Sequence, residues 1–264
     1  MPEKYRHTLS FDYPDDIHGH MIDPKQTRNE VLDENFKYYD KKLKFFNRLI
    51  HFLFMILIFP ITWIRYGVKR KGIRRLRGYK KQLKGGFFTT CNHIFEWDYL
   101  IVRSCFYFKR GYMTVWKNNH NSSMGPLMRK VGSIPIPESK SLGMAKFYED
   151  VKECVDDGNM VHFYPEASMW YYYQGLREFK PGCFVLAAKC NKPVVPLAIS
   201  FRPAKGLYKL WKRKGYPTCT VEVGKPIFPD NSLEFKDCVN KLKDDCYKAT
   251  KEMMEKNTPF IKEK

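Results

Sequence analysis

The spacing of hydrophobic residues changes twice along the chain and divides it into three parts. Residues 1–30 show no regular period of apolar positions, so we expect an irregular N-terminal lead. From Val31 apolar residues recur at steps of three and four, which predicts an amphipathic helix with a lysine-rich opposite face. Residues 85–264 alternate between short apolar runs and amphipathic stretches, which predicts an α/β domain.

Within the α/β part, short apolar runs predict strands and longer amphipathic stretches predict helices. The predicted strands are 86–91, 111–116, 131–136, 159–163, 193–200 and 217–223, and the predicted helices are 97–107, 140–156 with Ser139 as N-cap, 181–190 and 232–257. We expect residues 201–216 to be a basic, aromatic loop. This alternation indicates a mostly parallel or mixed central sheet covered by helices, with its site beyond the carboxyl ends of the strands.

The most apolar stretch of the chain covers residues 49–64 and is bounded by basic residues on both sides. It includes His51 and Pro60, and it is shorter than the roughly 20 apolar residues that a membrane-spanning helix needs. The positive-inside rule also disfavours moving either basic flank across a membrane. We therefore expect residues 31–84 to be a monotopic or re-entrant anchor on the cytoplasmic face of a membrane. A buried core helix is the alternative.

The charge of the chain narrows the class of partner. Lys and Arg number 47 and Asp and Glu 28, which gives a formal net charge of +19 and favours a nucleic acid, an anionic membrane or an acidic substrate. More than half of this excess lies in residues 65–84, where ten of twenty residues are Lys or Arg. This basic collar directly follows the apolar stretch, and no nucleic-acid-binding motif is present, so we expect an anionic membrane surface and no nucleic acid.

The eight cysteines form no Cys-x-x-Cys pair, so we expect reduced, buried thiols and no metal site.

A histidine and an aspartate five residues apart follow the first predicted strand of the α/β part. His93 and Asp98 occupy a predicted strand-to-helix turn, where both side chains can point into one crevice. The carboxylate can then hold one imidazole nitrogen and leave the other to take a proton from a substrate hydroxyl. Such a pair often arises by chance, so it does not establish catalysis alone. Cys91 offers a rival nucleophile, but a cysteine that ends a buried strand is more commonly a small hydrophobe.

Four sequence blocks, taken in order, resemble the motifs of the glycerolipid acyltransferase family, which includes the lysophosphatidic acid acyltransferases. The blocks are Asn-His-x-x-x-x-Asp at 92–98, Gly-Ser-Ile-Pro-Ile at 132–136, Phe-Tyr-Pro-Glu-Ala-Ser at 163–168 with its extension at 179–184, and Val-Val-Pro-Leu-Ala-Ile at 194–199. The resemblance implies transfer of an acyl group from acyl-CoA or acyl carrier protein to the hydroxyl of a lysophospholipid, without a cofactor. It also implies an N-terminal helical membrane platform, as the apolar stretch does.

The resemblance assigns roles to the matching residues. His93 becomes the general base, Asp98 its orienter, and Glu166 a ligand of the acceptor or a group that positions it. Further candidates for substrate binding lie in or near the four blocks: Asn92, Lys117, Arg129, Gly132, Ser168 and Lys180. Individually, the cations near the motifs, including Lys130 and Arg177, are expected to be solvated surface charges. The aromatic run at 170–173 is expected to line an acyl or headgroup pocket, to lie at the membrane interface, or to pack in the core.

The chain departs from the family pattern at two places. The family usually has Gly, Thr and Arg after the third-motif glutamate, whereas residues 167–169 are Ala, Ser and Met. The second motif usually ends in Arg, whereas residues 137–138 are Pro and Glu. Those arginines are associated with the acceptor phosphate, so the headgroup stays open: we favour lysophosphatidic acid or a related lysophospholipid. A glycolipid, an aminolipid or a soluble hydroxyl compound is the alternative, and a basic nucleic-acid-binding or membrane-binding protein without catalysis is the alternative outside the enzymes.

Overall fold

The fold is built on a mixed β-sheet. The computed structural model describes residues 3–40, 44–106, 109–138, 142–211 and 215–260. Over these residues seven strands lie in the order β1-β7-β6-β2-β5-β3-β4. The strands are β1 (Lys69–Lys71), β2 (Phe87–Thr90), β3 (Gly111–Trp116), β4 (Ser133–Ile136), β5 (Met160–Phe163), β6 (Val194–Arg202) and β7 (Thr218–Val223). Only β6 and β7 pair in antiparallel fashion among these described strands. The predicted α/β fold with a mixed central sheet is confirmed.

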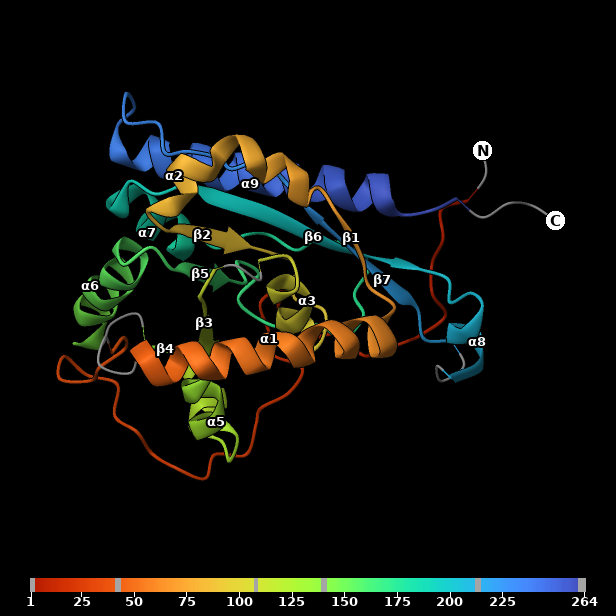
Figure 1. Ribbon diagram of the computed structural model, residues 1–264, viewed down its shortest axis with the longest axis horizontal. Coiled ribbons are helices and arrows are strands. Elements are labelled where there is room, and N and C mark those ends of the chain that lie inside the picture. The colour runs from red at the N-terminus through yellow and green to blue at the C-terminus, as the bar shows by residue number, and fades with distance from the viewer. Residues whose placement is uncertain (1–2, 41–43, 107–108, 139–141, 212–214, 261–264) are drawn as a thin grey trace.

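Helices cover both faces of the sheet. They are α1 (Lys44–Tyr66), the 3-10 helix η2 (Ile73–Tyr79), α2 (Lys80–Lys84), α3 (Asp98–Arg103), α4 (Lys117–His120), α5 (Gly125–Lys130), α6 (Gly143–Asp156), α7 (Gly182–Cys190), α8 (Leu207–Trp211) and α9 (Phe235–Asn257). Because neighbouring strand residues point to opposite faces, Phe88 joins the core formed with α6, α7 and α9, and Phe87 joins the core formed with α3. Figure 1 shows α9 and α1 on opposite sides of β2 and β6.

A glycine directly precedes β2 for a steric reason. Gly86 has a φ of +89°, and a Cβ atom at this position would lie 1.9 Å from the carbonyl oxygen of Val155. Only glycine avoids both the left-handed penalty and this clash. The close approach seats β2 beside the end of α6 and so fixes where the motif that follows β2 emerges from the sheet.

The structure corrects three of the predicted elements. The helix predicted from Val31 is wrong for residues 31–40, which are irregular: the backbone N–H groups of Tyr38 and Tyr39 donate to the Asp150 carboxylate and not to carbonyls of a helix. The apolar period there reflects docking on α6. The basic collar contains β1, η2 and α2, and the predicted loop at 201–216 holds the end of β6 and helix α8. The predicted N-cap Ser139 lies outside the described residues.

Helix α1 presents apolar side chains to solvent. Its exposed large hydrophobic residues are Leu49, Phe52, Leu53, Ile56, Leu57, Ile61, Trp63 and Ile64. Ile58, Thr62 and Tyr66 are buried against the domain. In the part of the chain that the structure describes, no helix combines the length and the hydrophobicity that crossing a bilayer requires.

Candidate active site

Strand register brings the first and third sequence blocks together. In the parallel pair β2–β5, Thr90 lies opposite Phe163. His93 and Glu166 each follow three residues after this pair, so the two loops leave the same edge of the sheet side by side. The backbone N–H of His93 donates a hydrogen bond to Glu166 Oε2 at 3.2 Å. The site therefore lies beyond the carboxyl ends of central parallel strands, where α/β sheets place their ligands.

His93 and Asp98 form a hydrogen-bonded pair. His93 Nδ1 lies 2.8 Å from Asp98 Oδ2, and the Asp98 side chain is fully buried at the start of α3. The same carboxylate oxygen accepts the backbone N–H groups of Ile94 at 2.8 Å and Phe95 at 3.4 Å. These donors satisfy the buried charge. Among the described residues none bonds to His93 Nε2, so this nitrogen is available to a substrate.

Glu166 is held entirely by protein groups. Its carboxylate pairs with Arg177 Nη2 at 2.8 Å and accepts the backbone N–H of Arg177 at 3.1 Å in addition to that of His93. Burial raises the pKa of the Glu166 carboxyl, and the Arg177 guanidinium opposes that shift. Both of its oxygens are thus engaged in holding the two motif loops together. Its predicted role as a ligand of the acceptor stays a prediction.

Arg177 is the functional residue that the sequence reading placed wrongly. It is only 1% exposed, whereas we expected a solvated charge. Its guanidinium bonds to Ser168 Oγ and to the carbonyl oxygens of Ile17 and Ser168, and its Cζ lies 4.5 Å from the centre of the Trp170 ring. The third motif lacks its usual arginine, and Arg177 supplies a buried one from nine residues beyond Ser168.

The turn after Glu166 requires an unusual backbone conformation. Ala167 has a φ of +65°, in the left-handed region that a side chain disfavours. Glycine, which the family usually has at this position, adopts that conformation without penalty. The departure from the family pattern at this position therefore costs local backbone strain.

Asn92 and Cys91 have contacts within the fold. The Asn92 amide bonds to both backbone groups of Ile199, at 3.0 and 2.8 Å, and so continues the pairing of β2 with β6 beyond the last ladder position. Cys91 is fully buried, and burial raises the pKa of its thiol well above the usual value. A thiol in that state is a poor nucleophile. All eight cysteines are free and buried, as predicted.

Of the remaining predicted binding residues, Lys180 lies beside the motif loops, whereas Lys117, Arg129 and Gly132 contact other parts of the fold. Lys117 forms an ion pair with Glu138, and Arg129 in α5 donates to the carbonyl of Lys37 at 2.8 Å. Gly132 precedes β4, whose register places it level with Phe88 rather than with the carboxyl end of β2, and two strands separate β4 from β2. These contacts do not support Arg129 and Gly132 as substrate ligands. Lys180 is exposed and donates its backbone N–H to Pro165 O at 2.8 Å, next to Glu166.

The N-terminal lead crosses the site edge, which the sequence did not reveal. His18 Nδ1 lies 3.0 Å from the carbonyl of Glu166, and the indole N–H of Trp170 donates to Gly19 O at 2.9 Å. The His20 ring stacks on Trp116 at the end of β3, with ring centres 4.0 Å apart. The lead therefore spans the carboxyl ends of β5 and β3. A segment without periodicity carries no signal for such long-range docking.

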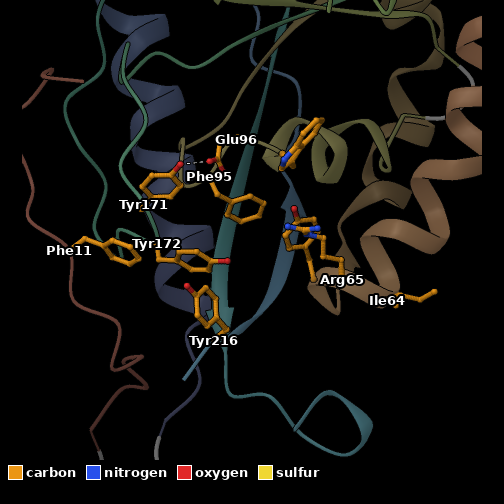
Figure 2. Close-up of a pocket in the computed structure, with 10 residues that line it drawn as sticks. Phe11, Ile64, Arg65, Phe95, Glu96, Tyr171, Tyr172 and Tyr216 are labelled. Carbon is orange, nitrogen blue, oxygen red and sulfur yellow. Dashed lines mark hydrogen bonds between the residues drawn. The ribbon is translucent and has the colours of Figure 1, made fainter. Parts of the chain in front are cut away.

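An aromatic cleft borders the first motif. Its volume is about 730 Å³, and it is lined by Phe11, Ile64, Arg65, Tyr66, Phe95, Glu96, Trp97, Tyr171, Tyr172 and Tyr216. Figure 2 shows aromatic rings from the N-terminal lead, the first-motif loop and the 170–173 run gathered beside the end of α1. Of the three readings of that run, cleft lining applies to Tyr171 and Tyr172, and core packing to the buried Trp170. In the described part of the chain, no group of three or more His, Cys, Asp or Glu side chains is arranged to hold a metal ion.

Comparison with known proteins defines the class. The model of the Acyltransferase family matches residues 70–200. The crystal structure of the 1-acyl-sn-glycerophosphate (LPA) acyltransferase PlsC from Thermotoga maritima is similar in fold, with a TM-score of 0.59 and 15% sequence identity over 86% of this chain and 87% of that chain. A search of curated proteins found no match. The match covers all four sequence blocks, so the chain belongs to the Acyltransferase family, and it shares the fold of a solved LPA acyltransferase.

Proposed function

We propose that this acyltransferase moves a fatty acyl group from a thioester, acyl-CoA or acyl carrier protein, to the hydroxyl of a lysophospholipid. The observation that carries the proposal is the contact of 2.8 Å between His93 Nδ1 and Asp98 Oδ2, which leaves the second imidazole nitrogen for substrate. The family match supports the acyl transfer, and the fold of a solved LPA acyltransferase supports the choice of acceptor.

The chemistry follows from the poor nucleophilicity of a hydroxyl at neutral pH. His93 Nε2 takes the hydroxyl proton as the oxygen attacks the thioester carbonyl, and the carbon–sulfur bond then breaks. The imidazolium returns its proton to the departing thiolate, so the enzyme ends unchanged. Asp98 stabilises the transient positive charge on the imidazole. The thioester is already activated, so no enzyme-bound acyl intermediate is needed, and the buried Cys91 thiol has no part.

We further propose that the protein works at the cytoplasmic face of a membrane. The exposed apolar side chains of α1 support burial in the headgroup–acyl boundary, and the basic collar that follows supports attraction to anionic lipids. The aromatic cleft opens beside the end of α1 and borders the first-motif loop, which suits it to a fatty acyl chain. On this proposal the lipid substrate reaches His93 from the bilayer.

The test is acyl transfer by purified protein in mixed micelles. His93→Ala should remove turnover of a thioester donor with lysophosphatidic acid while preserving the circular dichroism spectrum and vesicle binding. Turnover at the wild-type rate in His93→Ala would refute the mechanism.

A panel of acceptors tests the headgroup. Lysophosphatidic acid, lysophosphatidylglycerol and a neutral lysolipid should be compared at equal surface concentration. We expect lysophosphatidic acid or another phosphate-bearing acceptor to be preferred, because the exposed Lys180 beside Pro165 and Glu166 places a cation at the edge of the site. Good activity on the neutral acceptor alone would show that the missing arginines have changed the substrate.

A further inference from the structure

The ring of Tyr164 lies against the imidazole of His93. Tyr164 is the first residue after β5, and the two rings are stacked with their centres 3.8 Å apart and their planes 11° apart. The Tyr164 hydroxyl donates a hydrogen bond to Asp98 Oδ1 at 2.5 Å. The other carboxylate oxygen, Oδ2, faces His93 Nδ1. One tyrosine therefore contacts both the proposed general base, His93, and the carboxylate that orients it, Asp98.

The tyrosine is itself fixed from behind. His162 in β5 packs edge-on against the Tyr164 ring at 4.5 Å, and His162 Nδ1 lies 2.8 Å from Thr89 Oγ1 on the neighbouring strand. Burial raises the pKa of Tyr164 well above its usual value, so the hydroxyl keeps its proton and acts as a donor. A neutral donor at this point draws negative charge toward Oδ1 and away from the oxygen that faces the imidazole.

We propose that Tyr164 is a positioning residue that orients Asp98 and His93 together and moderates the pull of the carboxylate on the imidazole proton. The proposal rests on the proposed acyl transfer. Removing the hydroxyl leaves the ring stack in place and takes one of the four donors from Asp98. The carboxylate then binds a protonated imidazole more strongly, and the base becomes available only at higher pH.

The charged and titratable groups near His93 come from several elements, and the substitution removes a hydrogen bond from Asp98 alone among them. They are Asp98 at the start of α3, Glu166 with Arg177 after β5, the neutral His162 in β5, His20 of the N-terminal lead and Lys180 before α7. A shift in the acidic limb of the pH profile therefore reports the Tyr164–Asp98 contact.

The experiment compares Tyr164→Phe with Tyr39→Phe. The Tyr39 hydroxyl donates to Asp157 at 2.7 Å, a bond of the same type in the opposite core. For Tyr164→Phe we expect kcat to fall about tenfold or more, KM for the acceptor to stay within about twofold, and the acidic limb of kcat/KM to move to higher pH by about half a unit or more. Tyr39→Phe should keep the wild-type profile. A wild-type kcat and pH profile in Tyr164→Phe would overturn the proposal.

A double-mutant cycle separates this role from general damage to the fold. In the Asp98→Asn background, Tyr164→Phe should cause little further loss of kcat, because the hydroxyl acts through Asp98. Equal fold-losses in both backgrounds would contradict the proposal. Titration of the His93 ring protons by NMR in wild-type protein and Tyr164→Phe gives a readout without turnover, and an unchanged titration midpoint would also contradict it. The His93→Ala test decides the proposed function separately. Full activity in that variant would refute His93 as the general base, regardless of the result for Tyr164→Phe.

Discussion

Glu166 Oε2 accepts the backbone N–H of His93 at 3.2 Å, which joins the third sequence block to the first across two parallel strands. The carboxylate that makes this contact is buried and paired with Arg177. A group in this position holds the loop that carries the base. Any direct contact of Glu166 with an acceptor would have to compete with these protein donors.

The first prediction concerns this buried pair. Glu166→Ala leaves the guanidinium of Arg177 buried without its charge partner, and the loss of unfolding free energy should be about 3–5 kcal/mol. Urea unfolding measures it. Asp245→Ala is the matched control, because the Asp245–Lys241 pair is exposed on α9 and should contribute no more than about 0.5 kcal/mol.

Kinetics distinguish two roles for Glu166: a clamp that holds the first-motif and third-motif loops together, and a direct ligand of the acceptor. A clamp predicts that Glu166→Gln loses both stability and kcat, since the amide keeps the shape but not the charge. A wild-type unfolding curve together with a raised KM for the acceptor alone would instead identify Glu166 as a substrate ligand.

The second prediction concerns Asp98. The carboxylate accepts four donors, and an asparagine at this position turns its own NH₂ group toward some of them. We expect Asp98→Asn to lower kcat by about 10²- to 10⁴-fold, the range of general acid–base catalysis. Asp150→Asn is the control: Asp150 is also buried and accepts backbone N–H groups, from Tyr38 and Tyr39. It should lose comparable stability but keep its activity per folded molecule, and equal losses of activity would remove the special role of Asp98.

The sequence predicts those parts of the site that depend on the spacing of nearby residues. Apolar runs located strands β2 to β7 but not the short basic strand β1, and the strand register then brings His93 and Glu166 together. Arg177 escaped prediction because its partners Glu166 and Ser168 lie eleven and nine residues away across an irregular loop. The docking of residues 7–27 escaped it because aromatic and backbone contacts far apart in the sequence leave no periodic trace.

The same reasoning explains the wrong helix at residues 31–40. The apolar residues of this segment pack against α6. The Asp150 carboxylate accepts the backbone N–H groups of Tyr38 and Tyr39, which a helix would have used internally. A side chain from elsewhere in the fold thus overrode local propensity.

The third prediction concerns membrane binding by α1. Replacing Leu53, Ile56 and Leu57 together by Ser removes exposed apolar surface without touching the buried side of the helix. Partition onto anionic vesicles should fall about tenfold or more. A triple Ser variant at Val31, Leu233 and Phe235, which are exposed elsewhere, is the control. Wild-type protein should resist a molar salt wash and be released by detergent, and complete release by salt would show that the attachment is electrostatic only.

The fourth prediction concerns His162 and the pH dependence of stability. His162 is fully buried in β5, and burial lowers its pKa to about 3, with Asp98 opposing and His93 adding to the shift. An unfolded histidine titrates near its ordinary pKa of about 6.5, so between these values the unfolded chain binds the additional proton. Stability contributed by neutral His162 is therefore present above pH 6.5 and lost as the pH falls toward 3.

Urea unfolding of wild-type protein and His162→Gln at pH 7.5 and pH 5.0 measures this contribution. His7, His20 and His120 have pKa values lowered by burial as well, and they contribute the same sign in both proteins. The difference between the two proteins isolates His162: the wild type should lose about 2 kcal/mol more than the variant over this interval. Equal losses would mean that folded His162 accepts a proton near pH 6. The ring that packs behind Tyr164 would then be a charged imidazolium in weak acid, contrary to the prediction.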